Sequence, residues 1–359
     1  MEGAASGRRG GRSEPGSRRG WRCVGRAAGG AKVGVSSWSF TRERSRTLVD
    51  ARQPQVRFRG VDIVIIVACS LAALVLLGPA RWGYHAARNG WLFGMMALGP
   101  LVLRTLESRF PRQRLLSVAA DFWLLPVSAM VHGWLGPVVD WINPLVKDAQ
   151  LMATDQRLFG FQAAVELAHR VPPLLNDVLM LCYYGHFMWP LLLGILLYYR
   201  GRGATAGFDE YLLGLGLLFS LNYAAYSLVP AVGPRYFLIG AFDGPGLHGG
   251  PLTPLLESMM RTPLFTRDCF PSGHTGATLL VLFYAFRFYR TLFWVMLAPG
   301  IGLIIATLSG RFHYATDLLC AVPLVVVVTS LALVLSRAVR QRASEEAARS
   351  VPVDAIVRP

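Results

Sequence analysis

The sequence predicts an all-α polytopic membrane protein with about eight transmembrane helices. Two observations carry this prediction. Of the 359 residues, 53% are hydrophobic and only 16% are charged, and apolar windows of about 18 to 25 residues recur along the chain. A helix of that length crosses the hydrocarbon core of a bilayer, because each residue adds about 1.5 Å. A soluble globular fold is therefore excluded.

The apolar windows place the spans in order, and basic residues or Pro and Gly bound most of them. The third window is the least clear, since it contains Asp121 and His132; we favour a structural role for both, with the edge of a cavity as the alternative. An amphipathic connector, 136–172, follows it, and a short interfacial helix is expected near 254–260. The expected spans are 63–79, 91–103, 116–135, 174–199, 211–232, one that starts near 273, 292–308 and 314–335.

The basic residues are distributed unevenly along the chain. Residues 1–60 hold 14 Lys and Arg against four acidic residues, which is most of the net charge of +15. This segment has too few apolar residues to form a core, so we predict a disordered cytoplasmic tail, with contact to anionic lipid headgroups as the functional alternative. Its charge therefore gives no reason to expect a nucleic-acid partner. The first 40 residues also contain no apolar core of a cleavable signal peptide.

The flanking charges also indicate the orientation. If the N-terminus is cytoplasmic, eight spans put the loops at 104–115, 200–209 and 287–290 and the C-terminal arginines inside, in agreement with the positive-inside rule. Both termini are then cytoplasmic, and we expect a multi-pass protein of a bacterial plasma membrane. The expected domains are the tail of residues 1–60, a transmembrane domain over 61–338 and a polar C-terminal tail over 339–359.

Two polar clusters flank the sixth and seventh spans. Pro-Ser-Gly-His occupies 271–274, and Arg-Phe-His-Tyr-Ala-Thr-Asp occupies 311–317. A chain that crosses a bilayer and crosses back returns to the face that it left, so His274 and His313 can meet at one surface. In this topology the surface is extracytoplasmic, and Arg235, at the end of the fifth span, lies on the same side.

The residue types in these clusters suit phosphoryl transfer. His313 and Asp317 are four residues apart, so on a helix the carboxylate can fix the tautomer of a nucleophilic imidazole and stabilise its later positive charge. Ser272 and the backbone N–H groups at a helix start near Gly273 can bind an anion, and His274 can protonate a leaving oxygen. Taken singly, each cluster also fits an ordinary helix start or capping contact.

In their order along the chain, Arg235, the Pro-Ser-Gly-His motif and His-xxx-Asp resemble the type 2 phosphatidic acid phosphatase superfamily of membrane phosphatases and phosphotransferases. The resemblance covers about residues 60–335 and implies a six-helix catalytic core bundle. Three stretches are similar more narrowly to its inositol phosphorylceramide synthase-like (inositolphosphotransferase) branch, namely Asp-Gln-Arg-Leu-Phe-Gly at 155–160, Val-Gly-Pro-Arg at 232–235 and the 311–317 cluster.

The resemblance implies a role for each matching residue. His313 would form a phosphohistidine, Asp317 would orient it, and His274 would be the general acid. The residues that would hold phosphate oxygens are Ser272, Gly273, Arg235 and Arg311. Three positions depart from the superfamily's pattern. Leu228 stands where a Lys is usual seven residues before Arg235, and Tyr236 stands where a Pro usually follows it, with Pro234 before the Arg instead. Thr307 stands where an Arg is usual six before His313. Arg311, two before His313, is the arrangement of the synthase-like branch.

The implied function is a lipid phosphotransferase that moves a phospho-headgroup between lipids, with a phospholipid, sphingolipid or polyprenyl phosphate as substrate. A phosphatase of the same kind is the alternative, and a non-catalytic lipid-binding or transport protein of the same fold is the second. The chain has no carboxylate cluster and no nucleotide-type glycine loop, and its five cysteines, at 23, 69, 182, 269 and 320, have no metal-type spacing. We therefore expect neither metal nor cofactor, and a packing role for Cys269.

Overall fold

The computed structural model describes residues 56–78, 83–201, 203, 205–244, 246–259 and 267–349, without the side chains of residues 137 and 347–349. Most of the predicted N-terminal tail and the last ten residues lie outside the described residues. Within these ranges every regular element is helical. The elements are α1 (Gly60–Leu77), α2 (Gly83–Arg109), α3 (Arg114–Asp121), α4 (Leu124–Ile142), α5 (Asp148–Phe159), α6 (Ala163–Arg170), α7 (Pro173–Arg200), α8 (Ala206–Leu228), α9 (Pro234–Phe237), the 3-10 helix η2 (Ile239–Ala241), α10 (Thr253–Met259), α11 (Gly273–Phe288), α12 (Arg290–Ser309) and α13 (Ala315–Arg349).

The prediction of a multi-pass membrane protein is confirmed in its main point. Five of the described helices, α1, α7, α8, α12 and α13, are long and apolar enough to span a membrane. The predicted third span is divided between α3 and α4, which are bent by 45° and count as a sixth if the pair is one span. The count of eight and the six-helix core remain predictions, since α11 has only 16 residues. The short helix expected near 254–260 is found as α10.

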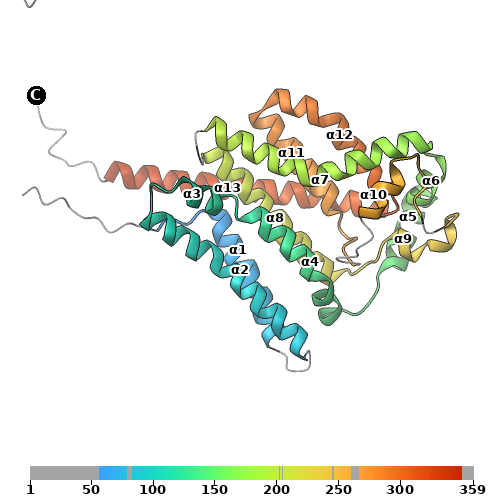
Figure 1. Ribbon diagram of the computed structural model, residues 1–359, viewed down its shortest axis with the longest axis horizontal. Helices are drawn as coiled ribbons and strands as arrows, with labels where there is room; N and C mark the ends of the chain where they lie inside the picture. The colour runs from blue at the N-terminus through green and yellow to red at the C-terminus, as the bar shows by residue number, and fades with distance from the viewer. Residues whose placement is uncertain are drawn as a thin grey trace, which may run out of the picture. The chain divides into compact units, whose positions relative to one another are not determined.

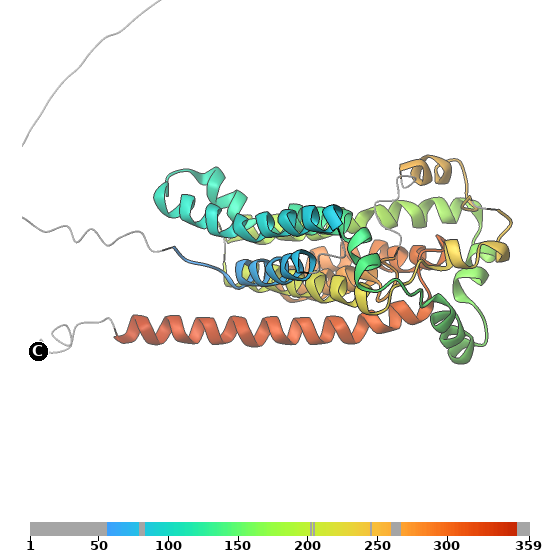
Figure 2. The same ribbon diagram turned by 90° about the horizontal axis from the view of Figure 1, so that it is seen from below.

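Helix α11 lies at the centre of the bundle. It packs against α7, α8, α12 and α13, while α13 runs alongside α8 (Figures 1 and 2). The sequence of α11 allows these close contacts because small residues face its neighbours: a Cβ on Gly276 would lie 3.2 Å from Leu218 of α8. Most α11 side chains are buried as a result. The first turn of α11, which carries His274, is therefore held from several sides.

The short helices α5, α6, α9 and α10 gather at one end of the bundle, where Figure 1 shows them together. The same end contains the N-termini of α11 and α13, because Ser272 N donates to Asp317 O over 3.1 Å. We call this the site end. Both predicted polar clusters thus lie at the site end, although the chain between them crosses the bundle and returns.

At the opposite end of α8, α1 and α2 bury an ion-pair network. Arg104 of α2 donates to Asp62 over 2.8 Å and to Asp121 over 2.8 Å, and Arg59 pairs with Asp121 over 2.8 Å. Arg104, Asp62 and Asp121 are each at most 3% exposed. The structural role expected for Asp121 is therefore confirmed: its carboxylate compensates a buried guanidinium where α3 meets α1 and α2.

Candidate active site

His313 lies in the link between α12 and α13, and its ring is fixed by neighbouring acceptors. Nδ1 lies 2.8 Å from the carbonyl oxygen of Cys269 and 3.4 Å from Oδ2 of Asp317. A proton on Nδ1 can be donated to the carbonyl, which leaves the lone pair on Nε2. The nearer partner of His313 is thus a backbone oxygen, and the Asp317 carboxylate expected in that place lies further away.

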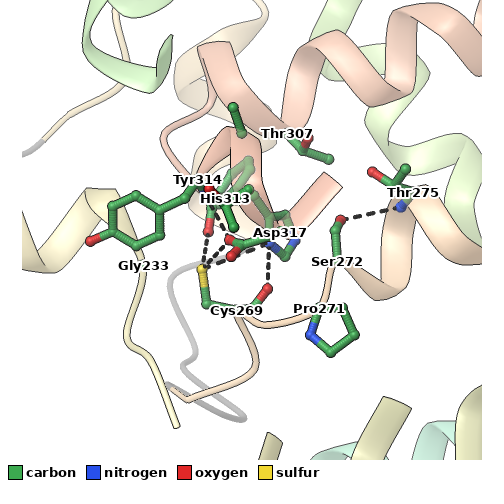
Figure 3. Close-up of polar contacts among 12 residues, drawn as sticks. Gly233, Cys269, Pro271, Ser272, Thr275, Thr307, His313, Tyr314 and Asp317 are labelled. Atoms are coloured by element: carbon green, nitrogen blue, oxygen red, sulfur yellow. Dashed lines mark hydrogen bonds and ion pairs between the residues drawn. The ribbon is translucent and has the colours of Figure 1, made fainter. Parts of the chain in front are cut away.

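Asp317 is held by a set of donors that the sequence did not indicate. Its Oδ2 accepts from Tyr314 N over 2.7 Å and from the Cys269 thiol over 2.9 Å (Figure 3). The carboxylate is fully buried, and its Oδ1 has no hydrogen-bond partner among the described residues. Asp317 therefore acts through short contacts to the chain around His313, in addition to its longer contact with the ring.

Cys269 is a hydrogen-bond donor as well as a packing residue. Burial, and then the nearby Asp317 charge, raise the pKa of its thiol well above the ordinary value. The thiol consequently keeps its proton near neutral pH and can donate it to Asp317. One residue thus contacts both partners of the pair, because its carbonyl oxygen lies against His313 and its sulfur against Asp317.

His274 meets His313 as the topology predicted. The two ring centroids are 5.7 Å apart, with the rings inclined at 63°. His274 also stacks on Tyr183 of α7, with centroids 4.6 Å apart, and lies 4.3 Å from the ring of His186. The Phe312 ring also stacks on Tyr183, with ring centroids 4.7 Å apart. The pair of imidazoles is therefore enclosed by an aromatic wall from α7 and the α12–α13 link.

Ser272 and Gly273 form the start of α11. Ser272 is its N-cap, and its Oγ accepts from Thr275 N over 3.2 Å. A Cβ on Gly273 would lie 2.7 Å from Asn222 Oδ1 and 2.9 Å from the Tyr226 hydroxyl, so a larger residue would displace these α8 side chains. The motif thus allows the close approach of α11 that brings His274 to the site, and it directs the first N–H groups of a helix toward the same end.

Arg235 and Arg311 are joined to each other through the backbone. Arg235 N donates to Arg311 O over 2.8 Å. The Arg235 guanidinium forms an ion pair with Glu257 of α10 and lies 5.9 Å from the centre of the Phe312 ring. Among the described residues, no hydrogen bond or ion pair links this guanidinium to His274 or His313. Glu257 is therefore its present partner at the site end.

Arg311 is buried in a constrained backbone position. Its φ is 64°, its side chain lies 4.1 Å from the centre of the Phe242 ring, and it donates to Gly244 O over 2.9 Å. Its Nε has no hydrogen-bond partner within the described chain. Burial, and then the positive charge of Arg235, lower the pKa of Arg311. A buried guanidinium with a donor to spare and a second cation beside it favours an anion in this region.

Two aspartates on α5 hold the loops that carry the predicted residues. Asp155 accepts from Ala315 N and Thr316 N, both over 2.8 Å, and so caps α13 just before Asp317. Asp148 accepts from Val232 N over 2.9 Å and Gly233 N over 2.8 Å, which fixes the turn before Arg235. Asp155 begins the stretch 155–160, whose resemblance to the synthase-like branch pointed to it in the sequence. No sequence motif pointed to Asp148.

Two further histidines lie near the predicted pair. His186, on α7, is beside His274, and its Nδ1 has no partner in the part of the chain that is described. His132, on α4, lies 3.5 Å from Asp268, the residue before Cys269. The contact with Asp268 does not separate the structural role expected for His132 from the cavity-edge alternative. Neither stands in a motif, so only the folded chain reveals their position.

A metal could be held by one group within the described residues. Ligand atoms of Cys269, His313 and Asp317 all lie within 4.8 Å of one another. In the present arrangement these atoms make the hydrogen bonds described above. The expected independence from metal thus remains a prediction.

Comparison with known proteins supports the family resemblance. A family model described as the PAP2 superfamily matches residues 149–331, which include every predicted catalytic and phosphate-binding residue. Comparisons with curated proteins and with solved structures gave no significant match. Members of the superfamily are phosphatases, and the match supports a lipid phosphatase or phosphotransferase; it does not identify the branch. The matched region covers α5 to the first half of α13, about half of the chain, and the chain therefore belongs to the PAP2 superfamily.

Proposed function

We propose that this protein is a lipid phosphotransferase of the inositol phosphorylceramide synthase-like kind, with its active site on the extracytoplasmic side of the membrane. The observation that carries the proposal is the approach of the two imidazoles, 5.7 Å between centroids, with Nδ1 of His313 occupied by a carbonyl acceptor. That arrangement leaves Nε2 of His313 as a nucleophile directed away from its fixed side.

In the first step Nε2 of His313 attacks the phosphorus of a lipid phosphoester. A P–N bond forms as the P–O bond to the leaving group breaks, and His274 delivers its proton to the departing oxygen. The imidazole of His313 carries positive charge in the phosphohistidine. The Cys269 carbonyl and the Asp317 carboxylate, at 2.8 and 3.4 Å from Nδ1, stabilise that charge.

In the second step the hydroxyl of an acceptor attacks the phosphohistidine. Its oxygen forms the new P–O bond, the P–N bond breaks, and His274, which lost its proton in the first step, takes the proton of the hydroxyl. The side chain of His274 is held for both transfers by its stacking on Tyr183. If water replaces the acceptor, the same steps give the phosphatase reaction.

The phosphate oxygens are assigned to the N–H groups at the start of α11, around Ser272 and Gly273, and to Arg235 and Arg311. The side-chain oxygen of Ser272 caps the helix, so the backbone N–H groups are the better donors. Arg235 exchanges part of its contact with Glu257 for the phosphate. Two cations, Arg235 and Arg311, beside the histidine pair favour a dianionic or monoanionic phosphoester over an uncharged lipid.

The test uses purified protein in lipid vesicles with radiolabelled phosphatidylinositol or phosphatidic acid as donor and ceramide or diacylglycerol as acceptor. The proposal expects label in the acceptor lipid, and release as inorganic phosphate or phosphoinositol only when the acceptor is omitted. His274→Ala and His313→Ala are expected to abolish both products. The control is His85→Ala, which removes an exposed histidine of α2. Activity that survives both substitutions at the site would contradict the assignment.

A further inference from the structure

A cavity lies in the apolar part of the bundle, lined by residues outside the candidate active site. It is a groove of about 610 Å³ between α1, α4 and α8, which falls within the range of ligand pockets. Its lining is apolar apart from three serines and Tyr223. Helices α1 and α8 are candidate spans, and most of α4 belongs to the bent pair that could form another. The groove therefore lies at a depth where lipid chains surround the protein.

The two sides of the groove differ in exposure. Its floor consists of buried α4 side chains, among them Leu124, Val127 and Leu135. Its rim carries large apolar side chains that are half exposed, such as Val67 at 50% and Leu71 at 57% on α1. A groove with a packed floor and an exposed apolar rim opens sideways into the hydrocarbon region of the membrane.

One end of the groove adjoins the candidate active site. Tyr223 lines the groove, and its ring is 6.1 Å from that of His132, which lies 3.5 Å from Asp268. On its other side Tyr223 is 6.0 Å from the ring of Tyr226, whose hydroxyl closes the space beside Gly273. Contacts thus run from the groove to Gly273 in the first polar cluster and, through His132, to Asp268 next to Cys269.

The groove extends from this end toward the middle of the bundle. On α8 its lining runs from Gly216 to Ser227, a length of about 17 Å. The Ser227 end is nearer the site, because Tyr226 and Asn222 are the α8 residues beside Gly273. On α4 the lining runs from Leu124 to Ile142, about 27 Å, so the groove is at least as long as one leaflet, which is about half of the 30 Å hydrocarbon core. A lipid with its headgroup at the histidines would place a chain along this path.

We propose that the groove between α1, α4 and α8 seats a hydrocarbon chain of the lipid substrate while its phosphoester lies between His274 and His313. This rests on the proposed function for the identity of the substrate. The α1 and α4 walls precede residue 149, where the family match begins. The groove is therefore built largely by elements outside the matched region. In this proposal the N-terminal helices select substrates with long hydrocarbon chains.

A photolabelling experiment tests the location of the chain. The probe is phosphatidic acid with a diazirine in one acyl chain, at low fraction in phosphatidylcholine vesicles that contain the full-length protein. We expect labelling of groove residues at least tenfold above labelling near Ala298, an exposed residue of α12 away from the groove. Excess dioleoyl phosphatidic acid should remove this labelling, whereas dihexanoyl phosphatidic acid should not.

Filling the groove provides the matched variants. Ala72→Phe on α1 and Ser220→Phe on α8 each place a ring in the groove, and Ala298→Phe adds the same ring on α12. The first two should lower groove labelling and turnover of dioleoyl substrate by about tenfold, with turnover of dihexanoyl substrate unchanged within twofold. Ala298→Phe should change neither. Retained turnover of the dihexanoyl substrate shows that a variant folds. If one of the two groove variants loses this turnover, the other groove variant provides the test.

The outcomes separate the two proposals. Uniform labelling of all lipid-facing helices, or equal effects of the three phenylalanines on long-chain turnover, would overturn the groove inference and leave the proposed function standing. Groove-specific labelling in a protein that turns over no phosphoester would overturn the proposed function instead. Labelling that persists in the groove of His313→Ala supports the inference, because seating of the chain does not require the chemical step.

Discussion

The two ends of the bundle bury polar groups in different ways. At the end formed by α1 and α2, the charges of Arg104, Asp62 and Asp121 compensate one another at hydrogen-bond distance. At the site end, Asp317 Oδ1, His186 Nδ1 and Arg311 Nε have no hydrogen-bond partner in the described chain. At the first end, each of the three buried charges has an opposite charge within the network and needs no ligand. At the site end, polar groups are buried without a partner, and the unpaired Arg311 Nε is a donor that the proposed phosphate could use.

The comparison also separates two kinds of loss on mutation. Removing one member of a compensated network leaves a buried charge without a partner, which lowers the free energy of unfolding. Removing His313 from the site end takes away a reactive group, while Asp317 keeps its shorter contacts to Tyr314 N and the Cys269 thiol. Substitutions at the two ends should therefore divide into effects on stability and effects on turnover.

The largest effect is expected at the histidine pair. His313→Ala should lower kcat by about 10⁴-fold or more, because the nucleophile is lost, and His274→Ala by about 10² to 10⁴-fold, because the leaving oxygen is no longer protonated. The thermal midpoint of unfolding should hardly move for either. Both are measured in detergent with the same labelled donor. A collapse of the fold in both variants, with no specific loss of turnover, would remove the distinction between the two ends.

The next largest effect is expected at the ion-pair network. Arg104→Ala should lower the free energy of unfolding by about 3–5 kcal/mol, since Asp62 and Asp121 lose their common buried partner. Turnover per folded molecule should stay within twofold. Denaturant unfolding followed by fluorescence checks the first, and active-site titration the second. The matched control is Arg88→Ala, an exposed arginine on the same helix, which should be neutral.

Asp155 should affect both quantities, because it supports the site without taking part in the reaction. Asp155→Asn weakens the cap of α13 and should cost about 1–2 kcal/mol of stability. It should also lower kcat several-fold more than it changes KM, since the start of α13 carries Asp317. Glu166→Gln, at an acid of α6 that pairs with Arg170 on the same helix, is the control. An unchanged kcat would show that the start of α13 keeps its position without the cap.

The smallest effect concerns Cys269. Cys269→Ala removes the donor to Asp317 and should lower kcat about fivefold, close to the value of one hydrogen bond, while Cys269→Ser keeps a donor and should recover most of it. The raised pKa of the thiol adds a pH dependence. Above the ordinary thiol value of 9.0 the unfolded chain loses this proton while the folded chain keeps it, so wild-type stability should fall with pH more steeply than that of Cys269→Ser. Parallel pH profiles would show that burial does not shift this group.

Local pattern and topology were enough to predict much of the fold and the meeting of the two histidines. Each apolar window predicts a helix from its own residues, without knowledge of the rest of the fold. Two successive crossings then bring His274 and His313 to one end of the bundle, whatever the detailed packing. The bend between α3 and α4 was missed, since it depends on how Asp121 reaches Arg104. The number of membrane crossings also stays a prediction, because α11 is short and held within the bundle.

The partners of the predicted residues could not be read from the sequence. Asp155 caps a helix that begins at residue 315, and no local pattern links positions so far apart. The acceptor for His313 is a backbone carbonyl, which every residue has, so its identity is invisible in the sequence. The same holds for the pairing of Arg235 with Glu257, which lies on a helix predicted only as interfacial. Residue types indicate the chemistry; the folded chain decides which group is fixed and which is free.

The central claim is that His313 takes up the phosphoryl group, and trapping of the intermediate tests it most directly. Protein is mixed with labelled phosphoester lipid without acceptor, quenched in alkali, in which phosphohistidine survives, digested and analysed by mass spectrometry. The account predicts phosphate on His313 in the wild type and none in His313→Ala. Phosphate on another side chain, or steady turnover by His313→Ala, would contradict it.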